Sequence, residues 1–147
     1  MNSRLVVGLG SEIRGDDAAG LLTVRALRKL DPAGVDVKEC TGDAASLAET
    51  IAQYPEVIVV DAVASAGPPG RVMEIRPESI GKHRRHGTHD AGLAEAIGLA
   101  NVLGANPTML VVGITGRSFE LGNKPDSAVI RAAAELAVNL GETLECA

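Results

Sequence analysis

The sequence contains very few aromatic residues: one Tyr, one Phe and no Trp among its 147 residues. Proteins that bind single-stranded nucleic acids stack bases on exposed aromatic rings, and phosphate binding needs a basic surface. Because the formal net charge is -5, the composition speaks against nucleic-acid binding. Hydrophobic residues make up 46% of the chain, so a core with so few rings must be built from Val, Ile, Leu and Ala.

Cysteines and long hydrophobic runs are also scarce. Cys40 and Cys146 are far apart and belong to no CxxC motif, so we expect two reduced thiols in a cytoplasmic protein. The N-terminal apolar stretch is too short for a signal peptide, and no run approaches the roughly 20 apolar residues of a membrane helix. We therefore expect a cytoplasmic protein without membrane contact, folded as a single domain over residues 1–147. Its oligomeric state does not follow from the sequence.

Apolar, β-branched runs alternate with helical patterns along the chain. The runs indicate strands at Arg4–Leu9, Val35–Cys40, Glu56–Val63, Arg71–Arg76 and Thr108–Thr115, and helical spacing indicates helices at Asp17–Leu30, Ala44–Gln53, His89–Leu103 and Asp126–Leu144. Runs such as VIVVDAV are typical of strands buried on both faces of a parallel sheet, whereas RVMEIR alternates like an edge strand. This order predicts a three-layer α/β/α domain with a mostly parallel, about five-stranded central sheet.

Three residues with metal-binding side chains come at the carboxyl side of different predicted strands, where α/β sheets bind ligands. Asp17 follows the loop after the first strand, Asp61 closes the run VIVV, and His89 begins the third predicted helix. Two carboxylates and an imidazole suit nickel or zinc with open coordination positions. Each residue alone has an ordinary explanation, as helix-dipole charge for Asp17 or a helix start for His89. The metal-site hypothesis rests on their convergence.

Other chemical patterns are weaker. Gly8-Leu9-Gly10 follows the first strand, but the third glycine of the dinucleotide-binding fingerprint is missing. The basic stretch 82–86 is more typical of a solvated loop than of a docking surface for an acidic partner. Ser65 and Ser79 lack an evident His and Asp setting, and Cys40 lies in a predicted strand, which disfavours covalent proteolysis.

The ordered combination of motifs resembles the nickel-hydrogenase maturation endopeptidases. The matching segments are Gly8–Gly20 with its acidic pair, Val60-Asp61-Ala62, Thr88-His89, Val112–Ile114 and Ser118–Leu121. They span nearly the whole chain. Two departures concern the loop: Ser11 stands where the family usually has Asn, and Ala18 where it usually has Gly. Neither touches the three proposed ligands, and Ala18 needs only ordinary helical backbone angles.

The resemblance implies a metal-dependent endopeptidase that removes a short C-terminal extension from a hydrogenase large-subunit precursor after nickel insertion. It implies that Asp17, Asp61 and His89 are both the catalytic residues and the metal contacts, and that the precursor supplies the nickel. Asp16 fits a loop or helix-cap role. The metal either lowers the pKa of a bound water or serves only for recognition, with Asp17 or Asp61 as general base.

Two alternatives stay open. A non-proteolytic relative would bind nickel in its free state and cut nothing. A phospho-receiver domain also carries an acidic pair and a strand-end aspartate, here Asp16, Asp17 and Asp61. Receivers, however, place the pair directly at the strand end and carry a Lys after the fifth strand, where this chain has Ile114–Arg117. Such fold-level analogy is a weak warrant for function.

Overall fold

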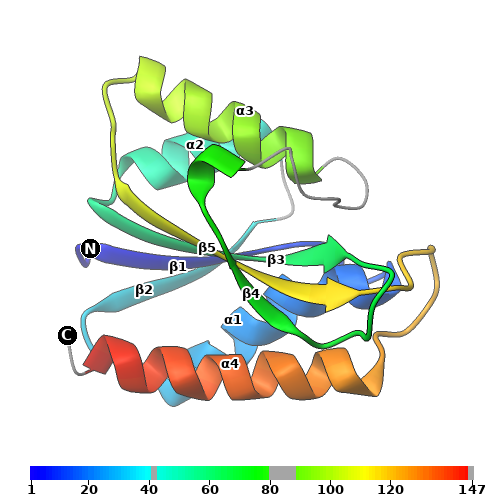
Figure 1. Cartoon of the computed structure of the whole chain (residues 1–147). Helices are drawn as coiled ribbons and strands as arrows, with labels where there is room; N and C mark the ends of the chain where they lie inside the picture. The colour runs from blue at the N-terminus through cyan, green and yellow to red at the C-terminus, as the bar shows by residue number, and fades with distance from the viewer. Residues whose placement is uncertain (41–42, 80–88, 146–147) are drawn as a thin grey trace.

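Five strands form one sheet that lies between two layers of helices (Figure 1). The computed structural model describes residues 1–40, 43–79 and 89–145, without the side chains of residues 79 and 89–91. Its elements are β1 (Arg4–Leu9), the 3-10 turn η1 (Gly15–Ala18), α1 (Ala19–Leu30), β2 (Val35–Cys40), α2 (Ala44–Ala52), β3 (Glu56–Ala64), β4 (Val72–Ile75), η2 (Pro77–Ser79), α3 (His89–Val102), β5 (Thr108–Gly116) and α4 (Ser127–Glu145). Every predicted strand and helix is present.

The strand order in the sheet is β2-β1-β3-β5-β4. Strands β2, β1, β3 and β5 are parallel, whereas β4 pairs with β5 in the antiparallel direction and forms one edge of the sheet. The short alternating segment RVMEIR therefore occupies an edge, as its pattern predicted. The predicted α/β fold with a mostly parallel five-stranded sheet is confirmed.

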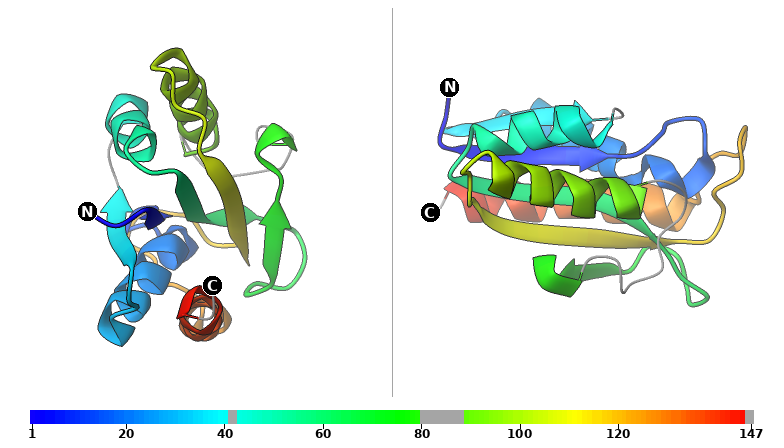
Figure 2. Two further views of the ribbon diagram at one scale, coloured as in Figure 1. Left: turned by 90° about the vertical axis from the view of Figure 1, so that its left-hand side faces the viewer. Right: turned by 90° about the horizontal axis from the view of Figure 1, so that it is seen from above.

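Helices cover both faces of the sheet, α1 and α4 on one face and α2 and α3 on the other (Figure 2). Neighbouring residues of β1 alternate between the two cores: Val6 packs towards α1 and α4, and Leu5 and Val7 pack towards α2 and α3. This is why the inner strands have continuous apolar runs. Among the described residues, no helix combines the length and apolar character needed to cross a membrane.

The start of α1 lies against the backbone of two strands. A Cβ atom on Gly8 would be 2.2 Å from the carbonyl oxygen of Gly20, and one on Gly20 would be 2.3 Å and 2.4 Å from the carbonyl oxygens of Leu9 and Val60. Real Cβ atoms do not approach so closely, so both positions require glycine. The absence of these two side chains brings the beginning of α1 onto the carboxyl ends of β1 and β3.

The first helix differs from its predicted start at Asp17. The chain first forms η1, and the α-helix begins only at Ala19. In η1 the N–H of Asp17 donates to the carbonyl of Arg14, three residues earlier, which is the hydrogen bond of a 3-10 helix. The N–H of Asp16 instead donates to an acceptor outside the turn, the Ser118 carbonyl. Ala18 has ordinary right-handed helical angles (φ -76°, ψ -6°), so its methyl group causes no strain.

Candidate active site

Two buried carboxylates lie at the carboxyl edge of the parallel strands. Asp17 belongs to η1 and is 3% exposed, and Asp61 belongs to β3 and is 1% exposed. Since η1 contacts β3, the structure brings the two segments together although they are distant in sequence. The Asp61 Oδ1 atom accepts a hydrogen bond from the N–H of Ala62 (2.8 Å). Burying carboxylates costs free energy. Two buried carboxylates in contacting segments therefore make this edge the candidate site.

The loop between β1 and η1 is closed by the peptide group of Asp17. Gly10 has a φ of +141°, and a Cβ atom there would be 2.0 Å from the Asp17 carbonyl oxygen. The same oxygen accepts a hydrogen bond from the N–H of Ser11 (3.3 Å). Both glycines of the Gly-x-Gly pattern thus permit close backbone packing within this chain. The loop is closed by a backbone N–H of Ser11, so this bond does not depend on which side chain stands at position 11.

Asp16 connects this loop to a distant segment. Its carboxylate is 1% exposed and accepts hydrogen bonds from three backbone N–H groups: Oδ2 from Arg117 (2.8 Å) and Ser118 (3.1 Å), and Oδ1 from Asp126 (2.7 Å). The backbone N–H of Asp16 also donates to the Ser118 carbonyl (2.7 Å). The expected loop-partner role of Asp16 is confirmed, and its reach to residues 117–126 goes beyond what the sequence indicated.

Thr115 organises the connection between β3 and β4. Its buried hydroxyl group accepts a hydrogen bond from the N–H of Arg71 (2.9 Å) and donates to the carbonyl of Pro68 (2.9 Å). The N–H of Gly70 donates to the Thr115 carbonyl (2.7 Å). Sequence reasoning did not single out this residue. The available signal was a hydroxyl side chain at the end of the otherwise apolar run MLVVGIT.

The third proposed ligand, His89, is the first residue of α3, and its side chain lies outside the described part of the structure. Thr88 and the basic stretch 82–86 also lie outside the described residues. Among the side chains that are described, no three His, Cys, Asp or Glu groups gather in a way that could hold a metal ion. The metal-ligand roles of Asp17, Asp61 and His89 stay predictions.

The alternative nucleophiles do not lie in catalytic settings, as far as the structure describes them. The Ser65 hydroxyl accepts a hydrogen bond from the N–H of Gly67 (3.1 Å) and so stabilises a turn. Cys40 ends β2 with a free thiol, whereas Cys146 lies outside the described residues, as does the side chain of Ser79. Among the described residues Ser65 shows no hydrogen bond to an Asp that would help to activate a nucleophile, and the side chains of all three histidines lie outside those residues.

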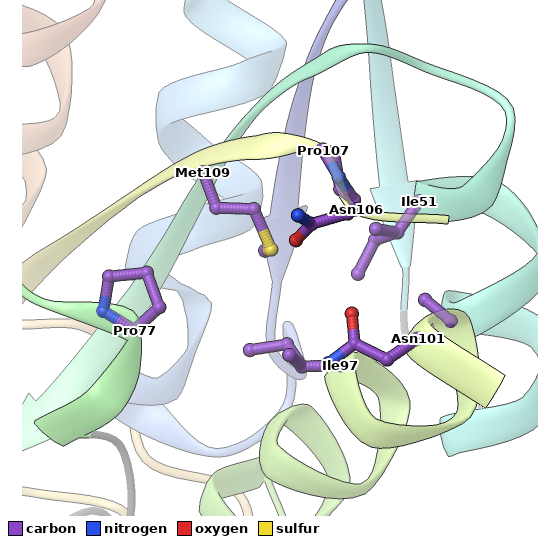
Figure 3. Close-up of a pocket in the computed structure, with 8 residues that line it drawn as sticks. Ile51, Pro77, Ile97, Asn101, Asn106, Pro107 and Met109 are labelled. Atoms are coloured by element: carbon purple, nitrogen blue, oxygen red, sulfur yellow. The ribbon is translucent and has the colours of Figure 1, made fainter. Parts of the chain in front are cut away.

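A pocket at the opposite edge of the sheet has a different character (Figure 3). It opens where β5 begins, and Ile51, Ile97 and Met109 face one another across it. Its complete lining is Ile51, Pro77, Ile97, Ala100, Asn101, Asn106, Pro107 and Met109. None of these side chains ionises near neutral pH, so the pocket offers no acid or base. The carboxyl edge is the better candidate for chemistry.

With this geometry in place, the comparison with known families is decisive. The sequence model of HycI, described as hydrogenase maturation protease, matches residues 23–143. This chain belongs to the hydrogenase maturation protease family. The matched range includes Asp61 and His89 and begins after the acidic pair of η1. No curated protein matches the chain significantly in sequence.

Solved structures extend the similarity to the whole chain. The [NiFe] hydrogenase maturation protease HycI from Thermococcus kodakarensis is 24% identical with a TM-score of 0.81, over 98% of this chain and 93% of its own. The hydrogenase maturating endopeptidase HybD from E. coli is 26% identical with a TM-score of 0.75, over 97% and 94%. The maturation protease HybD from Thermococcus kodakarensis is 27% identical with a TM-score of 0.74, over 99% of both chains. The segment with Asp16 and Asp17 thus belongs to the shared fold.

Proposed function

We propose that this protein removes the C-terminal extension of a nickel-containing hydrogenase large-subunit precursor after nickel insertion. One observation carries the proposal: a member of the hydrogenase maturation protease family places two nearly inaccessible carboxylates, Asp17 and Asp61, in contacting segments at one sheet edge. The family assignment supplies the reaction class, peptide-bond hydrolysis. The buried acids supply a place where a metal-loaded polypeptide is recognised. We place this reaction in the cytoplasm, in keeping with the free thiol of Cys40.

In this proposal the nickel is part of the substrate. Asp17 and Asp61 contribute two carboxylate groups, and His89 contributes an imidazole from the first turn of α3. Oxygen and imidazole donors together suit a borderline divalent ion. In the complex the precursor supplies further ligands to its own nickel, and the three side chains complete the metal site there. Recognition is then limited to precursor that already carries nickel.

Two routes to cleavage use the same residues. In the first, Asp17 or Asp61 takes a proton from the water that attacks the scissile carbonyl, as a general base. In the second, the carboxylates and His89 hold the metal, which lowers the pKa of that water. A serine or cysteine nucleophile is not part of either route, in keeping with the turn role of Ser65.

The test is cleavage of a purified precursor, loaded with nickel or without it, followed by intact-mass spectrometry. The unmodified protein runs beside Asp61→Asn, His89→Ala and Ser65→Ala. We expect loss of a C-terminal peptide only from the nickel-loaded precursor, and a fall of about a hundredfold or more in rate for the first two variants. Ser65→Ala is the matched control and should cleave at the unmodified rate.

The result that would contradict the proposal is the absence of cleavage by the folded, unmodified protein on nickel-loaded precursor. Nickel binding without cleavage would identify a non-proteolytic relative. Cleavage that survives Asp61→Asn and His89→Ala but stops with Ser65→Ala would identify a serine nucleophile in place of the proposed carboxylates. Circular dichroism of each variant separates a lost site from a lost fold.

A further inference from the structure

We infer that Asp16 is a positioning residue, which ties η1 to the segment between β5 and α4 and thereby holds the neighbouring Asp17 in place. The inference rests on the proposed function, in which Asp17 contacts the nickel of the precursor. Asp16 itself is buried and all its described bonds go to the protein backbone, so it acts through Asp17 and touches no substrate.

The Asp16 carboxylate accepts its hydrogen bonds from distant parts of the chain. The three donors lie 101, 102 and 110 residues away in the sequence, and all three are backbone N–H groups. One of them belongs to Asp126, whose own carboxylate accepts a hydrogen bond from the N–H of Ala128 at the start of α4. A single side chain therefore connects η1, the end of β5 and the beginning of α4. Charge-assisted bonds of this kind are stronger than those between neutral groups.

The position of η1 also depends on hydrogen bonds to other segments. A 3-10 turn of four residues has few internal hydrogen bonds, and here the Asp17 N–H donates to the Arg14 carbonyl and the Ala19 N–H to the Asp16 carbonyl. Contacts with other segments therefore contribute to its position. They include the Asp16 contacts, the bond from the Gly15 N–H to the Asn123 carbonyl (2.9 Å), and the bond from Ser11 to Asp17.

Asp16 also lies closely against the end of β5. A Cβ atom on Gly116 would be 2.5 Å from the Cβ atom of Asp16, so the absence of a side chain at position 116 lets Asp16 lie against the strand. The loop before η1 and the loop after β5 also lie side by side (Figure 2). They are joined by a hydrogen bond from the N–H of Gly122 to the carbonyl of Ile13 (2.8 Å). Asp16 is the buried centre of that contact.

The geometry demands a carboxylate at position 16. Both oxygens accept hydrogen bonds, Oδ2 from two N–H groups and Oδ1 from a third. An asparagine of the same shape has one acceptor oxygen, and its amide N–H groups would face backbone donors. Asp16→Asn therefore removes acceptors while it preserves volume.

The test compares Asp16→Asn with Asp36→Asn, which makes the same chemical change at the opposite edge of the sheet. Asp36 accepts hydrogen bonds from the Asn2 side chain (2.8 Å) and the Tyr54 hydroxyl (2.6 Å). Both variants are studied below their unfolding temperatures, by amide hydrogen exchange in NMR and by cleavage of nickel-loaded precursor. In Asp16→Asn we expect residues 15–18 to exchange about tenfold faster or more, and kcat to fall about tenfold or more with a smaller change in KM. Asp36→Asn should leave both quantities within about twofold of the unmodified protein.

Unchanged exchange at residues 15–18, or an unchanged kcat in folded Asp16→Asn, would overturn the inference and leave Asp16 with a purely stabilising role. If the unmodified protein fails to cleave the precursor, the proposed function fails, while the exchange measurement still decides whether Asp16 positions η1. If Asp16→Asn does not fold, exchange in the unmodified protein under increasing denaturant decides. Residues 15–18 should then open together with Arg117, Ser118 and Asp126, and independent opening contradicts the inference.

Discussion

The two edges of the parallel sheet differ in how deeply their charged and polar side chains are buried. At the carboxyl edge the chain buries Asp16, Asp17 and Asp61, and among the described residues these are the only buried Asp, Glu, Lys or Arg side chains. At the amino edge the Asp36 contacts are solvent-exposed or half-buried, and the ion pair of Arg4 with Glu56 lies partly in solvent. Burial of a carboxylate lowers stability unless fixed donors replace its water. This contrast supports the proposal that the functional chemistry lies at the carboxyl edge.

The edges also differ in how closely backbones approach. At the carboxyl edge Gly8, Gly10 and Gly20 let η1 and α1 lie directly on strand ends, so the segment with the acids is fixed by backbone contacts. At the amino edge side chains separate the elements and leave the apolar pocket of Figure 3. Such close packing restricts the positions that η1 can take, which is what a site that must fix two carboxylates requires.

The largest expected effect comes from a methyl group at the carboxyl edge. Gly20→Ala would place a Cβ atom 2.3 Å and 2.4 Å from two strand carbonyl oxygens. Backbone atoms in the centre of a sheet cannot move aside cheaply, so α1 must shift. We expect the free energy of unfolding to fall by about 3 kcal/mol or more, measured by urea denaturation, and precursor cleavage to be lost with it.

Gly98→Ala is the control for this change. Gly98 also lies in a helix, but nothing stands within 4 Å of its Cβ position. Alanine favours helix by about 0.5–1 kcal/mol over glycine, so this variant should be unchanged or more stable. Equal losses in Gly20→Ala and Gly98→Ala would contradict the close-packing account of the carboxyl edge.

A smaller effect is expected when a buried hydroxyl at this edge is removed. Thr115→Val keeps the shape of the side chain but leaves the Arg71 N–H and the Pro68 carbonyl without their Thr115 partner. We expect a loss of about 1–3 kcal/mol in the free energy of unfolding. Thr50→Val removes an exposed hydroxyl that donates to the Ser46 carbonyl in α2, and should cost less than about 0.5 kcal/mol. Similar losses in the two variants would show that the edge tolerates polar changes as the surface does.

Most of the fold could be predicted because local pattern and final burial agree. The run VIVV is apolar at every position because β3 lies between two helix layers. Such a run can be recognised in the sequence before the helices that pack on it are known. Predicted strand ends were off by about one residue, as at β3, which ends at Ala64. The exception was η1: no local pattern distinguishes a 3-10 turn from a helix start when the Asp16 N–H donates to the Ser118 carbonyl, 102 residues away.

The candidate site divides in the same way. Topology alone placed Asp17 and Asp61 at one sheet edge, because parallel strands share their carboxyl ends. The role of Asp16 could be guessed only as a loop or cap partner, since its three donors lie in another part of the sequence. The role of Thr115 was not predicted, because a threonine at a strand end is common in sequences. It becomes informative only through its hydrogen bonds with Arg71 and Pro68. The ligand role of His89 stays a prediction.

The smallest expected effect concerns the pH dependence of stability that Asp36 causes at the amino edge. The Tyr54 hydroxyl and then the Asn2 side chain donate hydrogen bonds to the Asp36 carboxylate and hold its pKa below the ordinary value of 3.8. A carboxyl group whose pKa is lowered by folding stabilises the protein above its ordinary pKa and loses that contribution as pH falls. The melting temperatures of the unmodified protein and Asp36→Asn should therefore differ by a constant small amount above about pH 5 and converge as pH falls below about 4.

Tyr54→Phe tests the cause of that pH dependence. It removes the principal donor, so NMR titration should show the pKa of Asp36 rising towards its ordinary value. The same titration on Thr50→Val should show no change, since Thr50 bonds to Ser46 in α2. A pKa of Asp36 that stays low in Tyr54→Phe would mean that the Asn2 hydrogen bonds and the N-terminal charge, and not this half-buried bond, stabilise the carboxylate.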